Sequence, residues 1–80
     1  MAQEYLPVVE RVIGALIGAT PDFDDLVQAT FAEAIRALPR FRGEASFKTW
    51  ISRIAVNQTL MHLRAGRLRR HAPLEIVPAQ

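Results

Sequence analysis

The chain has 80 residues, of which 50% are hydrophobic and 22% are charged, and it contains no cysteine. A chain of this length forms one domain around a small core. Without cysteine it has no disulfide and no thiolate metal site, so packed helices must provide its stability. An uncharged stretch such as residues 12–21 is far shorter than the roughly 20 apolar residues that span a bilayer, and no secretory signal opens the chain. We therefore expect a cytoplasmic domain without membrane insertion.

The net charge of +2 conceals a separation of charges along the chain. Residues 1–35 hold one arginine and six carboxylates, a net charge of −5, whereas residues 36–80 hold nine cations and two carboxylates, a net charge of +7. The basic half favours nucleic acid over a membrane surface as a partner, because no long apolar face accompanies it. Ordinary solvated charges are the alternative, but they explain interspersed signs better than separated ones.

The first expected helix spans residues 7–17. Pro7 is tolerated in the first turn of a helix, and Gly18 is a suitable terminator because glycine adopts the left-handed conformation that ends many helices. The β-branched residues of this segment also fit a strand, but their spacing and the punctuation at Gly18–Pro21 favour a helix. The apolar positions at helical spacing are Val8, Val9, Val12, Ile13, Leu16 and Ile17.

The second expected helix begins after Asp22, whose side chain is suited to cap the first turn, and ends at Pro39. Its expected buried face consists of Phe23, Leu26, Val27, Thr30, Phe31, Ala34, Ile35 and Leu38. The opposite face carries Asp24, Asp25, Gln28, Ala29, Ala32, Glu33 and Arg36. That face is small and partly acidic, which suits docking against another helix as well as ordinary exposure to solvent.

The third expected helix begins at the N-cap Ser46, spans residues 47–65 and stops at Gly66. The positions expected to face inward are Phe47, Trp50, Ile51, Ile54, Ala55 and Met61, and those expected to face elsewhere are Lys48, Arg53, Asn57, His62 and Arg64. Arg53 and Asn57 are one turn apart on the same side, so together they can contact a phosphate and a base edge. A basic run at residues 67–71 follows Gly66 and leads into an expected linker or frayed tail.

Residues 39–50, between the second and third helices, read PRFRGEASFKTW and hold three of the six aromatic residues of the chain. Rings to stack on, cations beside them and a glycine for close approach are features that bind nucleic acid bases. Phe41, Phe47 and Trp50 are equally suited to pin the loop to a small core, since aromatic side chains tend to be buried. The sequence leaves both roles open.

The sequence holds no recognisable catalytic or metal-binding arrangement. His62 and His71 have no neighbouring carboxylate and no serine or cysteine nucleophile in the sequence, and no metal-ligand spacing is present. We therefore expect surface roles for both histidines, and we expect neither an enzyme nor a cofactor.

Three segments of the chain carry a resemblance to a known family: DDLVQATF (24–31), ALPRFRGEASFKTW (37–50) and RIAVN (53–57). They are similar to region 2 of bacterial sigma-70-type factors, most of all to the extracytoplasmic-function (group IV) subgroup, and the likeness covers roughly Val8 to Arg70. The resemblance implies an all-α fold, a compact domain of three or four helices over residues 1–70. Residues 71–80 would then be the start of an interdomain linker or a disordered tail.

The resemblance also implies a role in transcription initiation. The second helix would dock on the clamp helices of the β′ subunit of the RNA polymerase core, with Asp25 and Gln28 as polar contacts. Ala29 departs from the glutamate that is usual in the family, which weakens or replaces one contact. The implied polymerase-binding residues are Asp24, Asp25, Gln28, Ala29 and Ala32.

The loop and third helix would recognise and melt the promoter −10 element. By resemblance, the loop receives a base flipped from the single-stranded non-template strand, Asn57 helps to read it, and Arg53 steadies the backbone near the melting point. Met61 stands where the family usually has a polar residue. The implied DNA-binding residues are Phe41, Arg42, Gly43, Glu44, Ala45, Ser46, Lys48, Arg53, Asn57, Met61 and Arg64.

Two other functions stay open beside this one. A sigma-like mimic would occupy an anti-sigma factor, itself an expected partner, and would never touch DNA; such a mimic has no need of Phe41, Arg53 and Asn57. A small enzyme is the third reading, and the absence of a catalytic constellation speaks against it. A complete factor of this subgroup would also carry a domain that reads the −35 element, and this chain stops where the linker is expected.

Overall fold

The computed structural model describes the backbone of residues 2–75 and the side chains of residues 4–66. In this part of the chain, three α-helices occur in the order α1 (Ala2–Ile17), α2 (Phe23–Ala37) and α3 (Phe47–Glu75). A 3₁₀ turn, η1 (Leu38–Arg40), follows α2 directly. The predicted all-α class is confirmed.

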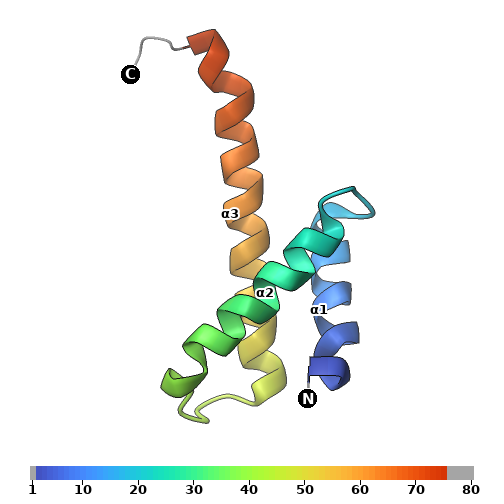
Figure 1. Cartoon of the computed structure of the whole chain (residues 1–80), viewed down its shortest axis with the longest axis vertical. Coiled ribbons are helices and arrows are strands. Elements are labelled where there is room, and N and C mark those ends of the chain that lie inside the picture. Colours follow the sequence, from blue (N-terminus) through green and yellow to red (C-terminus); the bar gives the residue numbers. More distant parts are fainter. Residues whose placement is uncertain (1, 76–80) are drawn as a thin grey trace.

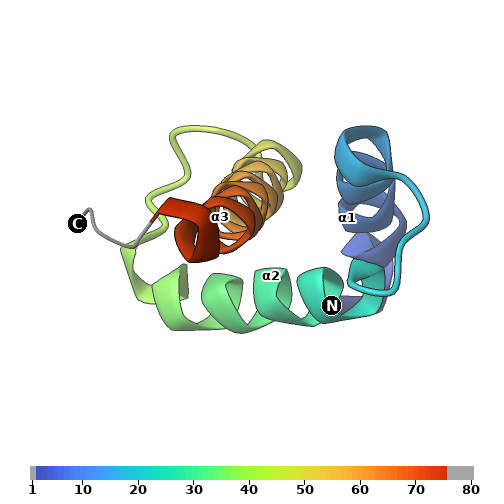
Figure 2. The same cartoon turned by 90° about the horizontal axis from the view of Figure 1, so that it is seen from above.

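The three helices pack as two against one. Helix α2 crosses both α1 and α3, which lie on the same side of it (Figures 1 and 2). Helix α3 is longer than its neighbours and extends beyond both of them (Figure 1). Its 29 residues span about 44 Å at 1.5 Å per residue, which accounts for the long dimension of the 45 × 27 × 16 Å molecule.

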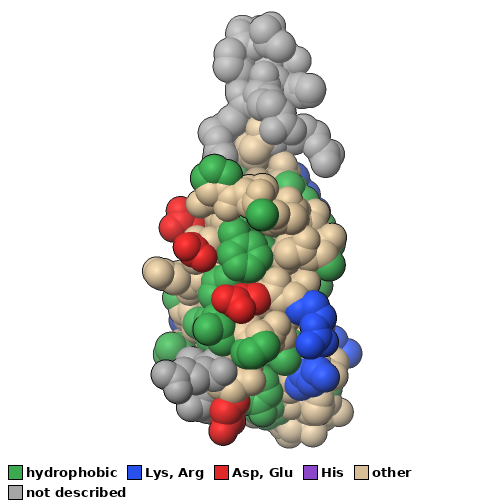
Figure 3. All heavy atoms as spheres, turned by 90° about the vertical axis from the view of Figure 1, so that its right-hand side faces the viewer, with side chains coloured by type: hydrophobic (Ala, Val, Ile, Leu, Met, Phe, Trp, Pro, Cys, Tyr) green, Lys and Arg blue, Asp and Glu red, His purple; other side chains and the backbone are tan. Residues whose placement is uncertain are grey.

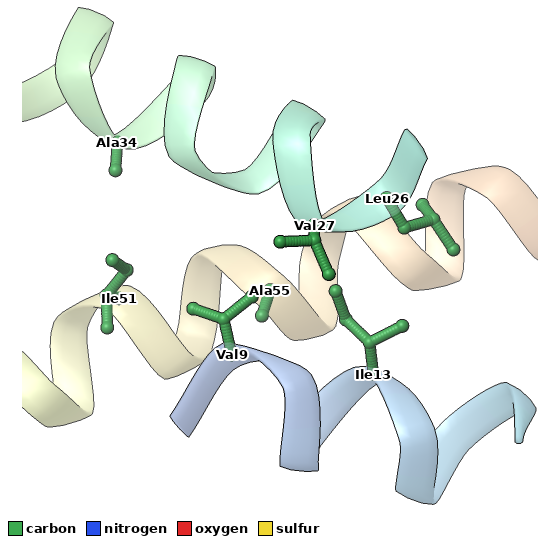
Figure 4. Packing of buried hydrophobic residues seen from close by; sticks show 7 residues of the cluster. All are labelled: Val9, Ile13, Leu26, Val27, Ala34, Ile51 and Ala55. Carbon is green, nitrogen blue, oxygen red and sulfur yellow. The ribbon is translucent and has the colours of Figure 1, made fainter. Parts of the chain in front are cut away.

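The core lies where the three helices meet (Figure 4). Its buried apolar residues are Val9, Ile13, Leu26, Val27, Ala34, Ile51 and Ala55. Each large aliphatic side chain buried here contributes about 1.5–3 kcal/mol to the free energy of unfolding. Thr30 and Thr59 are also fully buried, and their hydroxyls donate hydrogen bonds of 2.8 Å to the carbonyl oxygens of Leu26 and Ala55. The two hydroxyls therefore lie in the core without an unsatisfied donor.

Helix α1 begins five residues earlier than the sequence predicts, and Pro7 lies inside it. Proline has no N–H and cannot donate to the carbonyl four residues before it, so one backbone hydrogen bond is lost near the start of the helix. Packing offsets that loss: Tyr5 and Leu6 pack against the core, and the Tyr5 ring contacts Phe47 at 4.8 Å between centroids. The predicted stop is confirmed, because Gly18 has φ +70° and donates its N–H to Gly14 at 2.8 Å.

Helix α2 follows the predicted start, but Asp22 makes no capping hydrogen bond with its side chain. Asp22 has φ −86° and ψ −2°, in the α region, whereas a capping residue normally has the extended conformation that places its side chain over the first amides. Asp22 is thus the N-cap residue, as predicted, but the predicted capping hydrogen bond of its side chain is absent. The α-helix gives way to η1 at Leu38, one residue before the predicted Pro39.

The predicted buried face of α2 is correct along its first three turns and wrong at its end. Leu26, Val27, Thr30 and Ala34 are buried, but Ile35 is 73% exposed and Leu38 is 41% exposed. Both follow Ala34, the last buried residue of α2. The apolar stripe of the sequence therefore continues further than the core that covers it.

Helix α3 starts as predicted and ends later. Ser46 Oγ accepts a hydrogen bond of 3.1 Å from the Thr49 N–H, which is a side-chain cap. The predicted stop at Gly66 is wrong, because the helix continues through Gly66 to Glu75. Positive φ values occur only at Gly18 and Gly43 in the described backbone, so Gly66 does not adopt the left-handed conformation that ends a helix.

The inward face of α3 differs from the prediction at Met61. Ile51 and Ala55 are buried and Phe47, Trp50 and Ile54 pack against them, but Met61 is 56% exposed. Thr59 is the buried residue at this level of the helix. The side chains of the basic run at 67–71, and the predicted tail at 76–80, lie outside the described residues. The division of the chain at residue 70 stays a prediction.

Candidate nucleic-acid interface and docking face

The loop between η1 and α3 is short and held at both ends. Phe41 has an extended backbone and donates its N–H to the Leu38 carbonyl at 2.9 Å. Gly43 has φ +77°, a backbone conformation that residues with a side chain rarely adopt. Ser46 caps α3 at the other end of the loop. The glycine thus turns the loop back towards α3.

The aromatic side chains of this region form one cluster. Phe41 contacts Phe47 at 5.6 Å and Trp50 at 4.9 Å between ring centroids, and Phe47 contacts Trp50 at 5.3 Å. Tyr5 of α1 joins the cluster through Phe47. All four rings are half-buried. The cluster ties the loop to the body of the domain, which is the second of the two roles that the sequence left open.

Phe41 and Trp50 also line a pocket beside the loop. The pocket has a volume of about 590 Å³, within the range of small-ligand sites. Its lining combines both rings with three arginines, a carboxylate and a small residue: Arg40, Phe41, Arg42, Glu44, Ala45, Trp50 and Arg53. Five of these were predicted as DNA-binding residues. Arg40 and Trp50 were not, although both lie in the segment that the sequence singled out.

A second, open groove runs along α3 next to this pocket. Its lining residues are Lys48, Thr49, Ser52, Arg53, Val56 and Asn57. Arg53 borders both depressions, so the loop pocket and the face of α3 form one continuous surface. Asn57 is exposed, but it lies in the groove and not among the residues that line the loop pocket. Gly43 and Ser46 line neither depression.

Met61 and Arg64 continue this line beyond Asn57. Both are exposed, one and two turns further along α3. The structure therefore spreads the predicted DNA-binding residues over the loop and more than four turns of one helix. It does not gather all of them around one cavity.

The predicted docking residues lie on α2. Asp24, Asp25, Gln28 and Ala32 are exposed, and Ala29 is half-buried. Figure 3 shows the side of the molecule where α1 lies, with carboxylates among exposed apolar side chains and basic side chains gathered along one edge of this face.

Glu33 and Arg36 form an ion pair with one another further along α2. The Arg36 guanidinium donates two hydrogen bonds to the Glu33 carboxylate, of 3.0 and 2.6 Å. These hydrogen bonds, more than the charge of Arg36, hold the pKa of Glu33 below its usual range and raise the pKa of Arg36. The acidic part of the face is thereby limited to the start of α2.

One further contact was not predicted. His62 Nε2 of α3 lies 3.0 Å from Oδ2 of Asp22, the residue that immediately precedes α2 in the chain. The two residues are 40 positions apart, and no sequence pattern indicated that they meet.

In the part of the chain with described side chains, no group of three or more His, Cys, Asp or Glu residues is placed to hold a metal ion. None of the described helices is both long enough and apolar enough to cross a membrane.

The comparison with known families identifies the class of this domain. The chain belongs to the Sigma-70 region 2 family, whose model matches residues 1–69. Within that class it is similar to sigma factors of the extracytoplasmic-function type, as the sequence predicted.

The curated relatives are longer proteins. The chain is 42% identical over 60 residues to the ECF RNA polymerase sigma-E factors of Escherichia coli (strain K12) and Salmonella typhimurium (strain LT2). It is 48% identical over 44 residues to that of Haemophilus influenzae, with 55% of this chain and 23% of the relative covered. The first two matches cover 74% of this chain but 31% of the relative, so the chain spans about a third of their length. No solved structure matches it.

Proposed function

We propose that this chain is a transcription initiation domain that docks on the RNA polymerase core and melts the promoter −10 element. In this proposal α2 binds the clamp helices of the β′ subunit. The loop and α3 bind the non-template strand and capture one flipped base. The domain acts in the cytoplasm, where the polymerase is, and an anti-sigma factor is a further partner that competes for it.

The observation that carries the proposal is the pocket beside the loop, in a chain of this family. Opening a duplex costs a few kcal/mol per unstacked base, and stacking on protein side chains offsets part of that cost. Phe41 and Trp50 supply ring surface in the pocket, and Arg40, Arg42 and Arg53 supply positive charge for the adjoining phosphates. A pocket with these walls suits a planar base on a negatively charged strand.

The groove on α3 provides the reading function. Asn57 presents a donor and an acceptor side by side and is exposed one turn beyond Arg53. An amide in this position reads a base edge, whereas the cations hold the backbone without regard to sequence. Because Asn57 lies outside the loop pocket, we place its contact on the outer edge of the captured base or on the base next to it.

The DNA-binding half of the proposal is tested with the full chain bound to polymerase core. Fluorescence anisotropy would measure binding to single-stranded oligonucleotides that differ at one −10 position. Asn57→Ala should lower the preference for the best base by about 1–3 kcal/mol, because the base-edge hydrogen bonds are lost. Gln58→Ala, which alters the neighbouring amide on α3, is the matched control and should keep the preference.

The docking half is tested by comigration of the chain with polymerase core. Asp25→Arg should abolish comigration and Gln28→Ala should weaken it, because both side chains lie on the exposed face of α2. Glu4→Arg makes the same charge reversal at an exposed position of α1 and should leave comigration intact. Retention that neither α2 variant changes would remove the docking assignment. A chain that binds core but no oligonucleotide would be the protein-binding mimic instead.

A further inference from the structure

The contact between Asp22 and His62 joins two separate elements. Asp22 immediately precedes α2, and His62 lies in the fifth turn of α3. Their side chains approach to 3.0 Å between Oδ2 and Nε2. The two atoms are within ion-pairing distance, and the contact joins a carboxylate oxygen to a ring nitrogen. The side-chain hydrogen bonds between described residues, by contrast, all join positions at most four apart.

The Asp22 carboxylate makes this contact and does not cap α2. It stands at the N-cap of α2, where an aspartate usually accepts from the first amides, yet its carboxylate makes no such bond. Its own N–H donates to Thr20 Oγ1 at 3.2 Å, and its carbonyl accepts from the Leu26 N–H at 3.0 Å. The backbone of Asp22 is thus fixed on both sides, while its carboxylate is directed to α3.

The contact lies where apolar packing of α3 ends. Thr59 is the last buried residue in the described part of α3, and Leu60, Met61 and Leu63 are all exposed. Beyond Thr59 no described side chain of α3 belongs to the buried core. The His62 side chain is 30% exposed and is the described polar group that ties this length of α3 to the start of α2.

We infer that Asp22 and His62 are a positioning pair that holds α3 beyond Thr59 at a set direction to α2. The consequence for activity rests on the proposed function. Asp24 and Asp25, the proposed polymerase contacts, follow Asp22 in the chain, and Met61 and Arg64, proposed DNA contacts, flank His62. The pair therefore couples the docking helix to the part of α3 that carries these proposed DNA contacts, without touching either partner itself.

The inference is tested first on the free chain, by a double-mutant cycle. Amide hydrogen exchange at residues 60–66 would be measured for the wild type, Asp22→Ala, His62→Ala and the double variant. Each single change should speed exchange several-fold, because it releases this length of α3. The double variant should exchange no faster than either single one, since the two side chains act through one contact. Leu63→Ala changes an exposed neighbour and serves as the control.

A second measurement separates positioning from general loss of stability. With the chain bound to polymerase core, His62→Ala should weaken binding to −10 DNA with a duplex edge about three- to ten-fold and leave affinity for core unchanged. His62→Gln keeps an N–H donor near the position of Nε2 and should restore most of the DNA affinity. A role in stability alone would not produce that combination of results.

The outcomes are distinguishable. Additive effects of Asp22→Ala and His62→Ala on exchange, or unchanged exchange in both, would overturn the positioning pair. Loss of core and DNA affinity together in His62→Ala would also overturn it, because the change would then be a general one. If the wild-type chain binds neither core nor DNA, the proposed function fails, and the exchange cycle still decides whether the pair holds α3.

Discussion

Gly18 and Gly66 differ in backbone conformation: one ends a helix and the other lies inside one. Gly18 ends α1 with φ +70°, and no atom lies within 4 Å of the position that a Cβ would take, so backbone conformation alone determines the effect of a side chain there. Gly66 also has open space around it, but its backbone is helical. An alanine therefore opposes the native conformation at one position and favours it at the other.

We expect Gly18→Ala to lower the free energy of unfolding by about 1–2 kcal/mol, the cost of a left-handed alanine. Gly66→Ala should instead increase helix content, because alanine is favoured over glycine by about 1 kcal/mol in a helix interior. Thermal unfolding followed by circular dichroism measures both effects. A Gly66→Ala variant with reduced helicity would contradict the continuous α3.

Ile51 and Ile35 have the same side chain in opposite environments. Ile51 is 1% exposed in the core, and Ile35 is 73% exposed on α2. Ile51→Ala should lower the free energy of unfolding by about 2–5 kcal/mol, a large share of the stability of a small domain. Ile35→Ala should change it by no more than about 0.5 kcal/mol. Urea titration of the two variants gives the comparison, and similar losses in both would show that the stripe of α2 is covered along its whole length.

At the scale of single elements, the start of α3 depends on its cap. Ser46 Oγ accepts from the Thr49 N–H, whereas Ser52 Oγ, inside the same helix, donates to the Lys48 carbonyl at 2.7 Å. Ser46→Ala should lower the free energy of unfolding by about 1 kcal/mol, because an amide of the first turn loses its acceptor. Ser52→Ala should be within about 0.5 kcal/mol of the wild type, since that carbonyl is already part of the helix. Equal losses would argue against the cap.

The Glu33–Arg36 pair gives α2 a small dependence on pH. The lowered pKa of Glu33 means that its stabilising contribution is present above the ordinary value of 4.5 and is lost as pH falls through the lowered folded value. Because the pair is exposed to solvent, we expect a small effect. Glu33→Gln should have a slightly lower melting temperature than the wild type at neutral pH, and the two curves should converge in acid. A difference that grows in acid would contradict the pairing.

At the scale of the whole molecule, the separated charges predict how binding responds to salt. Four described cations lie around the loop pocket and the adjoining groove, namely Arg40, Arg42, Lys48 and Arg53. If each neutralises one phosphate of a single strand, log K should fall with log salt with a slope of about −3, and Lys48→Ala should reduce that slope by about 0.7. Arg11→Ala removes an exposed cation of α1 and should leave the slope unchanged. Anisotropy titrations at several salt concentrations measure it.

Most of the local structure was predictable because its causes are local. Gly18, Ser46 and Pro39 act within a few residues of their own positions, and the helical spacing of apolar residues is visible in any short window. The errors of prediction concerned where helices begin and end. Tyr5 and Leu6 extend α1 through packing that no local pattern reports, and Gly66 continues α3 because a single glycine lowers helix propensity without ending a helix.

The candidate site was predictable as a segment and not as a set of contacts. The rings and cations of residues 39–50 are visible in the sequence, and the family relationship orders them into a function. Which of them share a pocket depends on the return of the loop at Gly43 and on the packing of Phe41 against Trp50. Arg40 and Trp50 enter the pocket for that reason, whereas Asn57 lies in the groove beside it.

By itself, the sequence determined that this protein is a helical domain with an acidic half and a basic half, since composition, spacing and charge are properties of the chain alone. Tertiary packing decided how far each apolar stripe is covered, and it left Ile35 and Met61 exposed. It also brought Asp22 to His62 across 40 positions. The physical reason is the same in each case: burial and side-chain contacts between distant parts of the chain depend on where the helices cross, and that crossing depends on all three of them together.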